Sequence, residues 1–432
     1  MSKWIRVCRS MIIFQKRKVA FSIRPVRSRI KRIYTIKYTA IHCCYWSICC
    51  SSGAFVAVYL LSLHYTNSQI GLALAAVNLL SAFLQPVVAA VADRSRKLFL
   101  KNFFTVLLGV ACFFAAARFF LVGAPPFLLA LLLVLELVTL YSLQPLVISL
   151  GIRINDLGVP VNFGFARGTG SLAYAGMSVF LGFLVDTLGP NPLSAVSVFL
   201  YLALGALVFT FAKERNRSFQ DIPTEPDPVS PKPSHRTPAK RPDSSGKRKF
   251  WTLMAAVAVL FCSYSIIGNY LIQITEHVGG SAREMGIAAG LSASIEMPSM
   301  IFFGFLVKKF RCSTILKCSL FFFFVKSLLT LTAANIASLY VAQFFQAFAY
   351  AQFTPASVYY VRQVVGERDT VKGQAFMTGA ATLGSVAASL VGGWLLDGPG
   401  VTTMLAVGTT VALVGFVMGF FSIEKTRTIA DA

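Results

Sequence analysis

Long apolar runs, each bounded by a few polar or charged residues, follow one another along almost the whole chain. The runs are about 20 to 25 residues long, the length that an α-helix needs to cross the hydrocarbon core of a bilayer. The pattern therefore predicts twelve membrane-spanning helices. Their predicted bounds are 38–62, 68–91, 98–122, 127–150, 163–185, 192–212, 250–274, 284–307, 313–334, 337–361, 371–396 and 401–423.

One stretch, residues 213–249, breaks this pattern. It holds ten Lys/Arg, five Asp/Glu and seven of the eighteen prolines, with almost no large apolar side chains. Such a composition cannot bury enough apolar surface to offset chain entropy, so we expect a disordered cytoplasmic linker. The linker would separate an N-terminal six-helix bundle, residues 38–212, from a C-terminal one, residues 250–423. Tails of residues 1–37 and 424–432 complete the predicted organisation.

The two predicted bundles carry matching short motifs. Ser68–Gly71 opens the second predicted helix, and Arg283–Gly286 opens the eighth. Gly182–Asp186 (GFLVD) ends the fifth, and Gly393–Asp397 (GWLLD) ends the eleventh. The glycines of the two motif pairs are offset by 215 and 211 residues, which agree within a short insertion. Both matches indicate a duplicated six-helix unit, a form of internal symmetry that transporter folds show.

The composition defines the class of protein. With 56% hydrophobic residues, 13% charged residues and a mean hydropathy of +0.68, the chain is far more apolar than a soluble protein. Alternating segments of about ten residues, typical of a membrane β-barrel, are not visible in the sequence. The predicted fold class is therefore an all-α membrane protein with two pseudo-symmetric six-helix bundles.

The net charge of +23 is explained by its position and not by nucleic-acid binding. Residues 1–37 contain twelve Lys/Arg and no acid, which is typical of a tail attracted to anionic lipid. Lys and Arg of the other loops fall mostly on the side of this tail, whereas the opposite loops carry few charges. By the positive-inside rule, both termini and the linker face the cytoplasm, and we expect a multi-pass protein of the cell's inner (cytoplasmic) membrane.

Nothing in the sequence indicates catalysis, a metal or a cofactor. The cysteines of the helical region are expected to act as small apolar side chains, and the cluster Cys43–Cys50 has only His42 beside it as a further ligand. No P-loop, nucleotide fingerprint, HExxH motif or nucleophile elbow is present. We therefore expect neither an enzyme nor an ATP-driven pump.

Two carboxylates lie inside predicted membrane helices, where a charge costs a few kcal/mol and is usually retained for a function. Glu136 is near the centre of the fourth helix and Glu296 is in the middle of the eighth. Each is a candidate carrier of a coupled proton, and each could instead hold an interhelical contact. For Glu136 the candidate contacts are Tyr141 and Arg118. The place of Arg118 close to the outer end of the third helix, however, is typical of an anchor at the membrane interface.

Two cations are placed in the same way. Arg167, in the first turns of the fifth helix, could clamp a substrate with its planar guanidinium or extend to the cytoplasmic interface. Lys326, deep in the ninth helix, is too far from either interface for that alternative. We predict substrate binding by these two residues and by four polar side chains, Asn269, Gln273, Gln346 and Tyr359.

Small residues and a proline provide candidate points of movement. Pro298 has no backbone N–H, so a backbone carbonyl close to Glu296 lacks its helical donor and the helix can bend there. A bend at this level is expected of a gating helix. Gly168 and Gly393 belong to sets of small residues in the fifth and eleventh helices. Such residues let helices approach closely, so we expect these two helices to slide against the opposite half.

Several motifs, taken together, resemble the major facilitator superfamily over residues 40–425. The loop Val91–Lys97, an acid followed by a basic cluster, is similar to the family's loop between helices 2 and 3, although Ala89 and Arg96 stand where glycines are usual. Further motifs resemble the branch with the lactose, nucleoside and phenylpropionate permeases. They are Gln85-Pro86, Phe163–Ser171, Glu296–Pro298, Lys308–Phe310, Lys326 and Gly392–Trp394.

The resemblance implies the major facilitator fold and proton-coupled import by alternating access. It also implies a gating role for Asp93, Arg94 and Lys97. In the lactose permease pattern, a His and a Glu one turn apart on helix 10 belong to a proton relay, and this chain has Gln346 and Ala349 in their place. The resemblance therefore implies neither a lactose-type proton relay at this place nor specificity for sugars.

The sequence thus predicts a secondary active transporter that moves a small organic solute by alternating access in symport with a proton. Two alternatives remain open: a proton-driven exporter of amphipathic compounds, and a non-transporting sensor or assembly protein of the same fold. The expected partners are the solute, the proton and membrane lipids, without nucleic acid, and the expected state is a monomer.

Overall fold

The computed structural model describes residues 32–94, 97–156, 163–218, 244–366 and 369–426. All regular secondary structure in these ranges is helical, and eleven helices are long and apolar enough to cross a membrane. A twelfth crossing, residues 336–365, is divided into three shorter helices. The predicted fold class is confirmed.

The N-terminal half begins with the helix Arg32–Ser62, which contains the π-helical segment η1 (Cys49–Ala54) and ends as α2 (Val56–Ser62). It continues with α3 (Asn67–Arg94), α4 (Lys97–Phe120), α5 (Pro126–Ser142), α6 (Gln144–Asp156), α7 (Phe163–Leu188) and α8 (Pro192–Ser218).

The C-terminal half contains α9 (Ser244–Asn269), α10 (Leu271–His277), α11 (Ala282–Lys309), α12 (Cys312–Leu331), α13 (Ile336–Phe344), the 3₁₀ turn η2 (Phe345–Ala347), α14 (Tyr350–Val365), α15 (Thr370–Asp397) and α16 (Val401–Ser422). Two helices extend into the range predicted as a linker, because α8 ends at Ser218 and α9 begins at Ser244. The rest of that range, and residues 1–31 of the predicted tail, lie outside the described residues.

Among the residues that the structure describes, four membrane crossings are interrupted, and they occupy equivalent places in the two halves. In the N-terminal half, the first crossing leaves α-helical geometry at η1, and the fourth is divided between α5 and α6. In the C-terminal half, the seventh crossing is divided between α9 and α10, and the tenth leaves α-helical geometry at η2. At the fourth crossing the cause is Pro145, which has no backbone N–H to donate to the preceding turn. The interruptions therefore follow the internal repeat that the sequence predicts.

Side-chain caps fix where two helices of the C-terminal half begin. At α11, Ser281 accepts from the backbone of the first turn, and Glu284 accepts from the Ser281 backbone N–H at 2.9 Å. At α13, Asn335 and Ser338 form the same reciprocal pair. These capping boxes satisfy backbone donors that have no partner within the helix.

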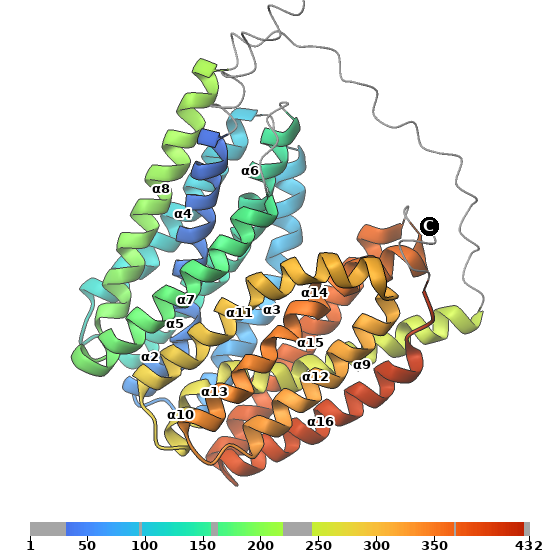
Figure 1. The fold of residues 1–432 in the computed structure, drawn as a ribbon. Helices are drawn as coiled ribbons and strands as arrows, with labels where there is room; N and C mark the ends of the chain where they lie inside the picture. The colour runs from blue at the N-terminus through green and yellow to red at the C-terminus, as the bar shows by residue number, and fades with distance from the viewer. Residues whose placement is uncertain (1–31, 95–96, 157–162, 219–243, 367–368, 427–432) are drawn as a thin grey trace, which may run out of the picture.

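The two bundles converge near α2 and α10 and spread toward the end where α8 and α16 end (Figure 1). At the junction α11 packs against α7, and α15 packs against α3. Both repeated motifs lie in these pairs of helices. A side chain on Gly286 would clash with the Ser178 carbonyl, and one on Gly393 would clash with the Asn67 carbonyl. The glycines are therefore required for the close approach of the two halves.

Candidate functional site

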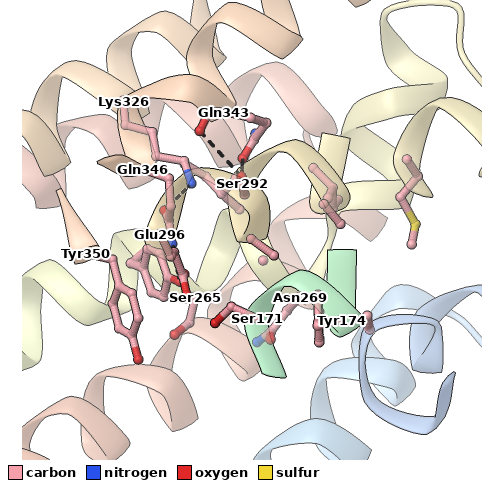
Figure 2. Close-up of a pocket in the computed structure, with 18 of the residues that line it drawn as sticks. Ser171, Tyr174, Ser265, Asn269, Ser292, Glu296, Lys326, Gln343, Gln346 and Tyr350 are labelled. Atoms are coloured by element: carbon pink, nitrogen blue, oxygen red, sulfur yellow. Dashed lines mark hydrogen bonds between the residues drawn. The ribbon is translucent and has the colours of Figure 1, made fainter. Parts of the chain in front are cut away.

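A cavity of about 320 Å³ lies between the two halves (Figure 2). Five residues that the sequence singles out line it: Arg167, Asn269, Glu296, Lys326 and Gln346. They come from the fifth and the seventh to tenth membrane crossings, so the site exists only when both halves are folded and packed together.

Gln346 connects two charged side chains at this cavity. Lys326 Nζ donates a hydrogen bond to Gln346 Oε1 at 2.7 Å, and Gln346 Nε2 donates to Glu296 Oε1 at 3.1 Å (Figure 2). The same amide donates to the Tyr264 hydroxyl at 3.0 Å. The amide oxygen thus faces the cation and the amide nitrogen faces the carboxylate, which is the orientation that stabilises both charges.

The local structure of three helices produces this network. Gln346 lies in the 3₁₀ turn η2, where the tenth crossing leaves α-helical geometry. Glu296 lies in α11 two residues before Pro298, and Lys326 lies in α12. Lys326 is 5% exposed and Gln346 2% exposed, so each needs an internal partner in an apolar setting. The hydrogen bond between them supplies it.

Arg167 approaches the cavity from α7 of the other half. Its Nη1 donates to Ser171 Oγ at 2.8 Å, one helical turn away, and its guanidinium carbon lies 4.0 Å from the centre of the Trp46 ring. Asn269 lines the cavity too, and donates to Ser389 Oγ on α15 at 3.0 Å. The cavity therefore presents polar groups from both halves.

The structure adds aromatic residues that the sequence reasoning missed. Trp46, Tyr174, Tyr264 and Tyr350 line the cavity, and the rings of Tyr264 and Tyr350 are stacked with centroids 5.2 Å apart. Trp46 lies within the cluster Cys43–Cys50, whose cysteines are interpreted from the sequence as small apolar side chains. Aromatic rings with polar tips inside membrane helices, away from the interfaces where they are usually enriched, are the signal that could have identified them.

Two predicted binding residues lie outside the cavity lining. Gln273 Nε2 donates to Asn67 Oδ1 at 2.8 Å, which makes it part of the contact between α10 and α3. Tyr359 is 39% exposed and packs against Phe303. The structure does not bring either side chain to the other predicted binding residues.

Glu136 also lies away from the cavity lining, in the interior of the N-terminal half. Its carboxylate accepts from Arg118 Nη2 at 2.7 Å and Nε at 3.1 Å, and from Ser52 Oγ at 2.5 Å. Tyr201 lies 3.4 Å away as a further donor. Both charged side chains are almost fully buried. Of the two interpretations of Glu136, this geometry favours an interhelical contact with Arg118, and it places Arg118 in the interior and not at an interface.

The predicted gating residues have different surroundings. The side chains of Asp93, Arg94 and Lys97 lie outside the described residues. Pro298 is inside α11, which continues through it. Gly168 of α7 faces Met297 of α11 so closely that a side chain there would displace the methionine. Gly393 lies at the α15–α3 contact described above.

Asp397 links the two halves at their junction. Its carboxylate, at the end of α15, accepts from the backbone N–H groups of Asn67 and Ser68 at 2.9 and 2.7 Å, and from Asn67 Nδ2 at 2.9 Å. Asn67 and Ser68 begin α3, so a carboxylate of one half caps a helix of the other. The helix dipole and the hydrogen bonds both favour the ionised form at this place.

We expect Asp397→Asn to loosen this junction by about 1 kcal/mol, because one charged acceptor of two backbone N–H groups is lost at an exposed site. Hydrogen exchange at Asn67 and Ser68, measured by mass spectrometry, should then be faster than in the original chain. Asp186→Asn is the matched control, because Asp186 is the repeat equivalent of Asp397 but is not the acceptor of the Asn67 and Ser68 N–H groups. Equal exchange in the original chain and Asp397→Asn would contradict the expectation.

A bundle of apolar helices in two repeated halves, with a charged cavity between them, defines a transporter of the major facilitator type. The model of the MFS_1-like family matches residues 35–407, and the chain belongs to this family. A comparison with curated proteins finds no match.

Solved structures with the same fold include the nucleoside transporter NupG, with a TM-score of 0.65, 13% identity and coverage of 91% of this chain and 98% of that chain. An auto-inhibited peptide transporter of the POT family has a TM-score of 0.65 at 10% identity, covering 90% and 96%. A bacterial homologue of the human lysosomal transporter Spinster has a TM-score of 0.58 at 13% identity, covering 92% and 97%.

Proposed function

We propose that this transporter moves a small organic solute together with a proton, and that Glu296 carries the proton. The observation that supports the proposal is the network Lys326–Gln346–Glu296 at a cavity between two halves. Glu296 is the one acid among the described residues that line this cavity. Glu136 already has a cationic partner, so we assign it a structural role.

The network suggests how the proton and the solute are coupled. When Glu296 is ionised, Gln346 can direct its nitrogen to the carboxylate and its oxygen to Lys326, as observed. A protonated Glu296 can itself donate, so the hydrogen bonds around Gln346 must rearrange. A change of charge at a buried site alters the free energy of each state by several kcal/mol, enough to decide which states can reorient.

Alternating access requires that the contacts at the junction break and re-form. In this structure the junction is held by the glycine contacts and by Asp397, while the bundles spread at the other end (Figure 1). We infer that the end that spreads faces the cytoplasm. Rocking of one half against the other would then expose the cavity to each side in turn.

The test of this function is proton movement that depends on the solute. The purified full chain is reconstituted in liposomes that hold a pH-sensitive dye, without an imposed gradient. Adding a transported solute outside should acidify the lumen, and a protonophore should remove the signal. Solute entry without any change of internal pH would refute proton symport.

The orientation has a test of its own. We propose that both termini and the linker are cytoplasmic, because Lys and Arg gather on that side. A reporter fused after Ala432 and one inserted at Ser234 should both lie in the cytoplasm, whereas one inserted at Gly123 should lie outside. Reporters at Ser234 and Gly123 on the same side would refute the orientation.

A further inference from the structure

We propose that the transported solute is a small organic monocarboxylate and that Arg167 binds its carboxylate. This inference rests on the proposed function, because it takes the central cavity to be the transport site. Three features of the cavity support it: the free hydrogen-bonding capacity of Arg167, the balance of charges in the lining, and the aromatic character of the walls.

The first feature is the state of the Arg167 guanidinium. Within the described part of the chain, its hydrogen bond to Ser171 is the only one it makes, and Glu296, the acid of the same cavity, acts on it across more than 4.0 Å and forms no ion pair with it. Arg118 provides the contrast, because it donates twice to Glu136. The Trp46 ring, whose centre lies 4.0 Å from the guanidinium carbon, holds the Arg167 head group at the cavity, and its remaining N–H donors can bind a carboxylate in bidentate geometry.

The second feature is the charge of the cavity. The described lining residues include two cations, Arg167 and Lys326, and one acid, Glu296. The empty cavity with ionised Glu296 therefore carries one excess positive charge, which is costly in an apolar interior without an anion. A monocarboxylate that binds while Glu296 is ionised neutralises that excess, and a proton on Glu296 then restores the charge of the empty cavity.

The same balance distinguishes between solutes during proton symport. A proton on Glu296 and a monocarboxylate on Arg167 together leave the cavity charge unchanged between its empty and loaded states. A neutral solute with a proton would raise the charge by one, and a dianion would lower it by one. Only the monoanion lets the two halves reorient with the same buried charge in both directions.

The third feature identifies the rest of the solute. Trp46, Tyr174, Tyr264 and Tyr350 present apolar surface beside the charged groups, in a cavity of about 320 Å³. That volume is at the small end of the range for organic ligands. An organic acid with an apolar body can use these walls, whereas inorganic phosphate cannot.

Binding to the purified full chain tests the proposal without a gradient. Thermal stability is measured with matched pairs of acids and amides, benzoate and benzamide, phenylacetate and phenylacetamide, butyrate and butyramide, and with inorganic phosphate. We expect at least one carboxylate to raise the melting temperature in a saturable way, while its amide and phosphate do not.

Variants then locate the binding group. Arg167→Gln should raise the Kd for that carboxylate about 10-fold to 100-fold, because a charged hydrogen-bond pair is lost. Arg167→Lys, which keeps the charge but loses the planar fork, should raise it less, and it serves in place of Arg167→Gln if that variant does not fold. Arg283→Gln is the matched control: Arg283 also stacks on an aromatic ring, at 4.2 Å from Phe183, but lies outside the cavity lining.

Four outcomes would overturn the proposal: equal stabilisation by an acid and its amide, stabilisation by phosphate alone, no stabilisation by any carboxylate, or unchanged carboxylate binding in the folded Arg167 variants. None of these measurements involves proton flux. Carboxylate binding without solute-driven acidification of liposomes would instead refute the proposed symport and leave the solute class standing.

Discussion

Replacing Glu296 with Gln is expected to abolish accumulation of the solute against its gradient, while exchange of labelled for unlabelled solute continues. Gln has the shape of the protonated acid and can still hydrogen-bond with Gln346, which lies 3.1 Å from the carboxylate in this structure. It cannot release a proton. The loaded carrier should therefore still reorient, but net uptake should lose its dependence on the pH gradient.

Proteoliposomes with an imposed pH gradient measure both activities in one preparation. Glu276→Gln is the control, because Glu276 is an exposed acid of the same half that lies outside the cavity lining. It should leave accumulation and exchange unchanged. Retention of pH-driven accumulation in Glu296→Gln would show that the coupled proton is carried elsewhere.

The second large effect is expected at the buried pair in the N-terminal half. Arg118→Leu leaves the Glu136 carboxylate without the cation that now lies 2.7 Å away. Breaking one side of a buried ion pair costs about 3–5 kcal/mol, and the nearby Ser52 and Tyr201 hydroxyls cannot replace the lost charge. The melting temperature in detergent and the folded yield should both fall sharply.

The double variant Arg118→Leu/Glu136→Leu separates stability from coupling. Removing both charges should restore most of the lost stability, because no uncompensated charge remains. If Glu136 has only a structural role, the double variant should also retain pH-driven uptake. A double variant no more stable than Arg118→Leu alone would contradict the assignment of a paired buried charge.

The sequence alone determined the class, the number of membrane crossings and the internal repeat. Lipid offers no hydrogen bonds, so an apolar run long enough to cross it must be helical, and length and composition are sufficient to locate such runs. The repeated glycine motifs were also visible in the sequence. In the structure both lie at the contacts between the halves, because only residues without a side chain permit that approach.

Only the tertiary structure decided which ionisable residues share a site. From the sequence, Glu136 and Glu296 were equivalent candidates for the proton carrier. Packing pairs Glu136 with Arg118, 18 residues away, and brings Glu296 to Gln346, 50 residues away, and through it to Lys326. A membrane helix is apolar both where it meets lipid and where it meets its neighbours, so no polar stripe along the chain shows which partner a buried charge will face.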